Sequence, residues 1–188
     1  MNSKEVEIAK ELSNIIPSKG IWVLNVKGNY QIRAILMFLK ALVDFKKMSG
    51  IVITMEKPHH YLTYLLGIHG ISQRSITYVD LALSHKKIFK FPIVIESQEP
   101  VVGGFFHRET VNLKDYGFML IDNIGHTRMH LRKETHQKIA NYLIEEAKKH
   151  RIFALFPMDK ERCPDVYTLL KNKADRIMLW EEVIKIAD

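Results

Sequence analysis

Two carboxylates stand where apolar runs end, and they are the residues best placed to do chemistry in this sequence. Glu56 follows the run 51–55, and Asp122 ends the run 118–122. Ligand sites in open parallel sheets form beyond the carboxyl ends of the strands, where a carboxylate can orient a water molecule or a hydrated metal ion. The alternative is structural, because a helix N-terminus also stabilises an acid and an aspartate commonly caps a turn.

The segment 25–34 is where a phosphate-binding loop is expected, because it joins the first apolar run to a helical pattern. Such a loop needs glycines that let several backbone N–H groups face the phosphates, a lysine that offsets their charge, and a hydroxyl that binds magnesium. This segment has one glycine, no Gly-Lys pair, and no serine or threonine. The nucleotide-binding candidates that remain are Lys27, Gly28, Asn29 and Arg33. A charged side chain does not replace a backbone cradle, so ordinary nucleotide hydrolysis is not expected.

Histidine is abundant, with nine copies, but its spacing does not favour a metal site. His126 and His130 have the i,i+4 spacing of a helical ligand pair, yet their surroundings are typical of a loop and no acidic residue lies between them. His59 and His60 would point about 100° apart on a helix. We interpret the histidines as dispersed surface residues and expect no metal. We interpret Cys163, the single cysteine, as a passive thiol.

Alternating strands and helices must position these candidates. Short continuous apolar runs predict strands that are buried on both faces, and amphipathic stretches between them predict helices. The strands are expected at 21–26, 51–55, 76–80, 118–122, 152–156 and 176–180, and the helices at 2–16, 31–48, after Pro58, 134–150 and 165–171. This alternation is typical of right-handed βαβ crossovers. It predicts an α/β fold with a mostly parallel central sheet and helices on both faces, in one domain over residues 1–188.

The region around 84–114 interrupts this alternation of strands and helices. Two β-prone runs, 91–96 and 101–106, are separated by a polar turn, which predicts a β-hairpin-like insertion. Its aromatic residues Phe105 and Phe106 either contact a partner or cap the edge of the sheet, and we prefer the second interpretation.

Composition and charge exclude several classes of protein. Of the 188 residues, 47% are apolar and 26% are charged, which matches a globular protein and not a disordered chain. No apolar stretch is long enough to cross a bilayer and no signal peptide is recognisable, so we expect a cytoplasmic protein without membrane insertion. The net charge of +7 favours acidic partners such as nucleic acid. Most basic pairs nevertheless stand at expected helix ends, where cations offset the helix dipole.

Several segments resemble the RecA/KaiC-like P-loop ATPases in their order and spacing. Segment 50–62 is similar to the strand, glutamate, turn and helix of KaiC-like members of the RecA superfamily. Segment 116–124 is similar to their Walker B strand. The helix and strand over 134–156 and the segment 174–180 follow in the order that this family implies.

The resemblance implies roles for the two carboxylates. Glu56 would occupy the position of the family's water-activating glutamate, and Asp122 that of the Walker B aspartate near magnesium. The segment 25–34 departs from the family because it has no Walker A motif. We therefore interpret the chain as a degenerate, archaeal-type member of this superfamily. No catalytic residue is expected, and Glu56 and Asp122 are either relics of the family's site or residues that serve binding alone.

Three hypotheses about function follow. The first is a non-catalytic RecA/KaiC-like module, a pseudoenzyme without a cofactor that regulates or scaffolds a protein partner. The resemblance implies self-association, since RecA-type domains commonly associate side by side. The second is a nucleic-acid-associated accessory protein, as in recombination or repair, whose binding weakens steeply as salt rises. The third is an unusual ATP-binding protein or weak ATPase that uses ATP and magnesium with Glu56 and Asp122.

Overall fold

A computed structural model of the chain describes residues 1–80, 113–129 and 133–187. Within these ranges, six parallel strands form one sheet in the order β3-β2-β4-β5-β1-β6. The strands are β1 (Gly20–Asn25), β2 (Gly50–Thr54), β3 (Ile76–Asp80), β4 (Phe118–Ile121), β5 (Phe153–Met158) and β6 (Arg176–Leu179). The α-helices are α1 (Ser3–Ile15), α2 (Gln31–Leu39), α3 (His59–Ile68), α5 (Lys133–His150), α6 (Pro164–Lys171) and α7 (Trp180–Val183). Shorter turns of helix are η1 (Gly28–Tyr30), η2 (Lys40–Phe45), η4 (Leu113–Asp115) and η5 (Ile124–Met129).

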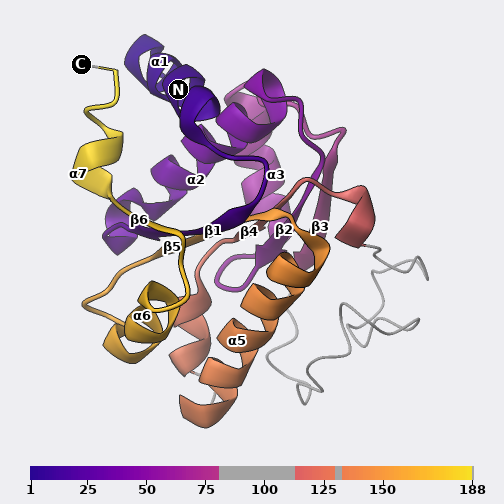
Figure 1. Ribbon diagram of the computed structural model, residues 1–188. Coiled ribbons are helices and arrows are strands. Elements are labelled where there is room, and N and C mark those ends of the chain that lie inside the picture. The colour runs from indigo at the N-terminus through magenta and orange to yellow at the C-terminus, as the bar shows by residue number, and fades with distance from the viewer. Residues whose placement is uncertain (81–112, 130–132, 188) are drawn as a thin grey trace.

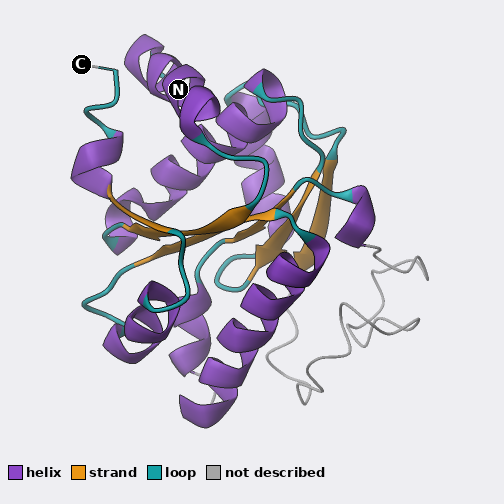
Figure 2. Ribbon diagram, in the orientation of Figure 1, coloured by secondary structure: helices purple, strands orange, loops and turns teal. Residues whose placement is uncertain are grey.

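Helices cover both faces of the sheet (Figure 1), with α1, α2, α3 and α7 on one face and α5 and α6 on the other. Figure 2 shows the sheet as the middle layer between them. Alternate residues of β1 enter opposite apolar clusters, because successive side chains of a strand point to opposite faces. Trp22 and Leu24 pack on the α1 and α2 side, whereas Ile21 and Val23 pack against α5 and α6. The α/β fold with a parallel sheet and two covering layers of helices is confirmed. The hairpin-like insertion predicted around 84–114 lies outside the described residues as far as residue 112.

Several predicted element boundaries were shifted by one or two residues, and at two of them the chain also adopts a different kind of structure from the one predicted. The helix predicted at 31–48 is α-helical only to Leu39, and η2 continues it as a π-helix, closed by the bond from the Lys46 N–H to the Ala41 oxygen. Trp180 was assigned to the last strand, but it begins α7. The Leu179 N–H donates to the Glu182 carboxylate at 3.0 Å, so the chain leaves the sheet one residue earlier.

The first residues of the neighbouring strands lie side by side in one row across the sheet. The first residues of five neighbouring strands are paired in register: Ile76 with Gly50, Gly50 with Phe118, Phe118 with Phe153, and Phe153 with Gly20. Gly50 has a steric role in this row, because a Cβ atom there would lie 2.2 Å from the Phe118 ring. A glycine inside a strand often marks such a close approach.

None of the described helices is long and apolar enough to span a membrane.

Candidate functional site

In the loop between β1 and α2, backbone N–H groups donate hydrogen bonds to acceptors of the chain itself. In η1, the Tyr30 N–H donates to the Lys27 oxygen at 2.9 Å, and the Gln31 N–H donates to the Gly28 oxygen. The Gly28 N–H donates to the Asp159 carboxylate at 3.3 Å. Phosphate-binding nests need successive N–H groups that converge on one point, commonly in alternating right- and left-handed conformations. Gly28 does not have the positive φ of such a nest, and three N–H groups here already have acceptors.

Asp159 brings a negative charge to this loop from the end of β5. Its Oδ2 atom faces Gly28, and its Oδ1 atom accepts the Glu161 N–H at 3.0 Å. The guanidinium of Arg162 lies 3.7 Å from the same carboxylate. A Cβ atom on Gly28 would approach this guanidinium to 3.2 Å. A carboxylate and a guanidinium of the chain itself therefore lie beside Gly28.

Gln31, the first residue of α2, ties together the ends of β4 and β5. Its side-chain Nε2 donates to the Asp122 carbonyl at 2.7 Å and to the Pro157 carbonyl at 3.0 Å. The residue is only 4% exposed. Sequence analysis did not identify Gln31, although a polar residue at the start of an apolar helix was an available signal.

We expect Gln31→Leu to lower the free energy of unfolding by about 2 kcal/mol, because two buried carbonyl oxygens lose their donor while most of the side-chain volume is kept. Urea unfolding at pH 7 measures the change. Asn29→Ala is the matched control, since Asn29 is exposed on η1 and its replacement should change stability by less than about 0.5 kcal/mol. Equal stabilities for the two variants would show that the Gln31 bonds contribute nothing.

Asp122 faces the turn that follows β2. Its Oδ1 atom accepts the Met55 N–H at 2.6 Å, and its carboxylate lies 3.4 Å from the Glu56 nitrogen. Burial raises the pKa of Asp122 to about 6, although the backbone N–H donors around the carboxylate act to lower it. The carboxylate therefore holds the backbone of the neighbouring turn, while the Asp122 carbonyl faces Gln31.

Glu56 lies at the same edge of the sheet and is held by a side chain from the end of β4. Its carboxylate accepts a hydrogen bond from the Asn123 amide at 2.6 Å. Both residues line a pocket of about 230 Å³, the β4–β5 pocket, which also contains Gln31, Gly125, His126, Asp159, Arg162 and Cys163. The structure thus brings Glu56 and Asp122 to the edge where the β1 loop lies. Within the described ranges, no three histidine, cysteine, aspartate or glutamate side chains are placed to hold a metal ion.

Arg33 does not lie with the other candidate residues at this edge of the sheet. Its guanidinium forms an ion pair with Glu5 of α1. Partial burial acts to raise the pKa of Glu5, but the Asn2 N–H and the Arg33 guanidinium hold it below its ordinary value. Arg33 therefore connects α2 to α1.

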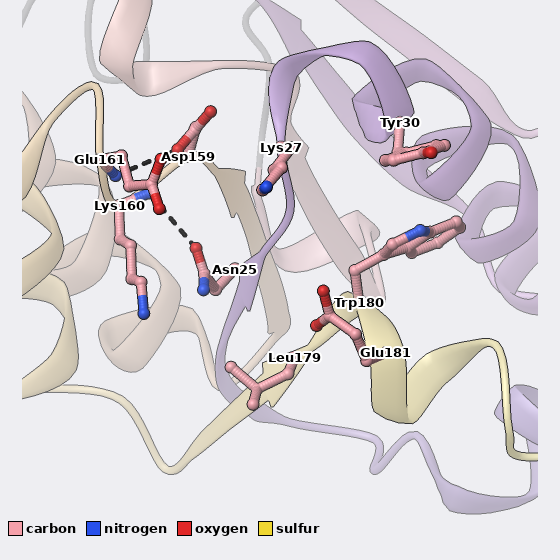
Figure 3. Close-up of a pocket in the computed structure, with 9 residues that line it drawn as sticks. All are labelled: Asn25, Lys27, Tyr30, Asp159, Lys160, Glu161, Leu179, Trp180 and Glu181. Carbon is pink, nitrogen blue, oxygen red and sulfur yellow. Dashed lines mark hydrogen bonds between the residues drawn. The ribbon is translucent and has the colours of Figure 1, made fainter.

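Lys27 lines a second pocket of about 300 Å³, the β1–β6 pocket (Figure 3). Tyr30 and Trp180 stack on one side, with ring centroids 5.9 Å apart and planes inclined by 20°. Asp159 and Glu161 lie on the opposite side, and the Lys27 amine projects between the two sides. The remaining lining residues are Asn25, Lys160, Leu179 and Glu181. Asp159 lines both pockets, so the two are neighbours across that residue.

The interpretation of the histidines as surface residues was wrong for His136. This residue is 2% exposed, and its Nε2 atom lies 2.8 Å from the Ile124 oxygen, so it links α5 to η5. His130 lies outside the described residues. The Cys163 thiol is buried and donates to the Gly125 oxygen at 3.3 Å.

Comparisons with known proteins define the fold and nothing finer. No known family model matches the sequence, and no curated protein matches it. Among solved structures, the chain is similar to a KaiC-like protein of the hyperthermophilic archaeon Pyrococcus horikoshii OT3. The TM-score is 0.58 at 11% sequence identity, and the match covers 86% of this chain and 70% of that one. The chain has a RecA/KaiC-like α/β fold. At this sequence identity the structural similarity shows a shared fold only, and the function must be argued from the residues of this chain.

Proposed function

We propose that this chain is a RecA/KaiC-like module with a degenerate nucleotide site, which does not hydrolyse ATP and acts as a regulatory or scaffolding interaction protein. The observation that carries this proposal is the Asp159 carboxylate bonded to the Gly28 N–H. A phosphate placed there would meet a negative charge that the chain itself supplies. It would also find the Tyr30 and Gln31 N–H groups already bonded within η1.

The carboxylates at the sheet edge do not fit a magnesium-nucleotide site in this arrangement. The Asp122 carboxylate is buried against backbone N–H groups of the turn after β2. Glu56 is bonded to Asn123, and no lysine follows a glycine at the start of α2. In this proposal both acids are structural: Asp122 fixes the turn that carries Glu56, and Glu56 joins the ends of β2 and β4.

An exposed apolar stripe on α3 supports a role in protein interaction. Tyr61, Tyr64 and Ile68 are spaced i, i+3 and i+7, which places them on one helix face. They are 39%, 66% and 59% exposed, whereas Leu62 and Leu66 of the same helix are buried. Clustered exposed apolar side chains commonly mark surfaces that contact other proteins.

The absence of a nucleotide site is tested by thermal unfolding with and without 1 mM MgATP. A ligand that binds only the folded state must raise the melting temperature, by several degrees when it is present at about a hundred times its Kd. We expect no shift and no phosphate release above background.

Glu56→Gln is the control for a contaminating ATPase. ATP hydrolysis by a contaminant is unaffected by this substitution. ATP hydrolysis by this chain that used Glu56 as the water-activating residue would be lost. A MgATP-dependent stabilisation together with turnover that Glu56→Gln abolishes would refute the pseudoenzyme proposal.

A further inference from the structure

The edge of the sheet opposite the β4–β5 and β1–β6 pockets carries exposed basic side chains. Lys19 precedes β1, Lys47 precedes β2, Arg74 precedes β3, and Lys148 and Arg151 precede β5; we call these five residues the amino rim. All five are exposed. They come from distant parts of the chain, and only the strand order places them together.

The register of the strands aligns the amino rim in a row. Beyond the paired first residues, the Gly50 N–H donates to Ser75, the Gly117 N–H to Ser49, and the Gly20 N–H to Ile152. The backbone is therefore in register up to the residues next to Arg74, Arg151 and Lys19. Neighbouring strands lie about 4.8 Å apart, so the row from β3 to β1 extends over about 19 Å.

The acidic residues near the amino rim are largely engaged elsewhere. The Asp175 carboxylate accepts the Ile21 N–H at 2.7 Å, and Glu145 pairs with Lys173 at 3.1 Å. Glu146 lies 3.3 Å from Lys149. Asp115 is exposed at this edge, and Asp175 lines a pocket together with three of the rim cations, so both acids reduce the positive charge.

The rim cations themselves are available to a ligand. None of the five forms an ion pair with another residue in the described part of the chain. Lys19, Lys148 and Arg151 line a pocket of about 330 Å³ together with Asp175, which makes the row concave near β1 and β5.

Two of the rim residues have an unfavourable backbone conformation. Lys47 and Arg151, with φ of 58° and 56°, are the two non-glycine residues of the described chain with positive φ. Each follows a helix end, a position where glycine is preferred because a Cβ atom costs about 1 kcal/mol in this conformation. The helix dipole favours a cation at such a position. It does not explain Lys19 or Arg74, which lie in connecting segments.

We propose that the amino rim binds the phosphate backbone of nucleic acid. A row of lysines and arginines matches a linear polyanion, and duplex DNA carries one negative charge per about 1.7 Å of its axis. Contacts of this kind position a nucleic acid without reading its sequence, so we expect binding to any duplex. This inference does not depend on the proposed loss of ATPase activity, because the amino rim and the β4–β5 and β1–β6 pockets lie at opposite ends of the strands.

The experiment compares binding of a 24-base-pair duplex DNA to the wild-type chain and to the double variant Lys47→Gly/Arg151→Gly, by fluorescence anisotropy from 50 to 200 mM salt. Glycine suits both backbone conformations, so this variant should remove two charges without loss of stability. We expect at least a 10-fold weaker Kd at 50 mM salt. The slope of log K against log salt should become about 2 less negative, because about one contact is lost per cation.

The matched control is Lys10→Gln/Lys160→Gln, which removes the same charge from exposed sites on α1 and at the opposite edge. This control should bind within about twofold of wild type. Thermal unfolding establishes that each variant is folded, and Lys19→Gln/Arg74→Gln replaces the glycine pair if that pair unfolds. The proposal is overturned if wild type does not bind at 50 mM salt, or if both double variants weaken binding equally. It is also overturned if polyglutamate competes as well as DNA at equal charge, which would indicate an acidic protein partner.

Discussion

Replacing Asp122 with alanine is expected to lower the free energy of unfolding by about 3 kcal/mol. The substitution removes a buried acceptor from the Met55 N–H and leaves a cavity beneath the turn after β2. Asp122→Asn is the matched variant, because it keeps one acceptor oxygen and nearly the same shape. It should lose roughly half as much stability at pH 7, as measured by urea unfolding. Losses below about 1 kcal/mol for Asp122→Ala would show that the carboxylate does not hold the turn.

The same residue should make stability depend on pH. The pKa of Asp122 is raised to about 6 in the fold, above the ordinary value of 3.8. Between these values the folded state binds more protons than the unfolded state, so the contribution of Asp122 is fully present below about pH 4 and is lost as pH rises through 6. Relative to Asp122→Asn, the wild type should therefore gain up to about 3 kcal/mol between pH 7 and pH 4. A flat difference across this range would contradict the raised pKa.

Gly50→Ala should destabilise the fold by about 3 kcal/mol or more. The new methyl group would lie 2.2 Å from the Phe118 ring, which is completely buried and cannot move aside without displacing β4. Thermal and urea unfolding would both report the loss. Gly67→Ala on α3 is the control, because its Cβ atom would meet only the end of the Gln73 side chain at 3.9 Å. Alanine in a helix should be neutral or stabilising there.

A double-mutant cycle separates this steric clash from a general intolerance of alanine. In a Phe118→Leu background the ring is absent, so adding Gly50→Ala should cost less than about 1 kcal/mol. If the cost of Gly50→Ala is the same in both backgrounds, the Phe118 contact is not its cause.

The sequence predicted the strands well because their signals are local. The runs that became β2 and β4 are continuous and apolar, and both strands are buried along their whole length inside the parallel sheet. The run that became β3 lies at the edge of the sheet and is only partly buried. The failures arise where the determinants are not local. The π-helical turn after Leu39 and the start of α7 at Trp180 depend on packing that no run of residues reveals.

The contacts of the candidate site could be predicted only in part. Glu56 and Asp122 were recognisable because carboxylates that end apolar runs must reach one edge of a parallel sheet. The Asp159 bond to Gly28 and the two bonds of Gln31 join residues 131, 91 and 126 positions apart. No spacing rule connects such residues. The amino rim could not be predicted for the same reason. Helix ends accounted for the basic clusters that contain Lys47, Lys148 and Arg151, and only the strand order shows that these residues share one edge with Lys19 and Arg74.

The pairing of β1 has a consequence for how the chain acquires its fold during synthesis. Strand β1 is made first, yet its two neighbours are β5 and β6, so Gly20 pairs with Phe153 and Trp22 with Arg176. A nascent chain therefore holds an apolar strand without partners until most of it has left the ribosome. Such long-range pairing slows folding and leaves intermediates prone to aggregate. Rapid completion of translation, or a chaperone that shelters β1, would favour the native sheet.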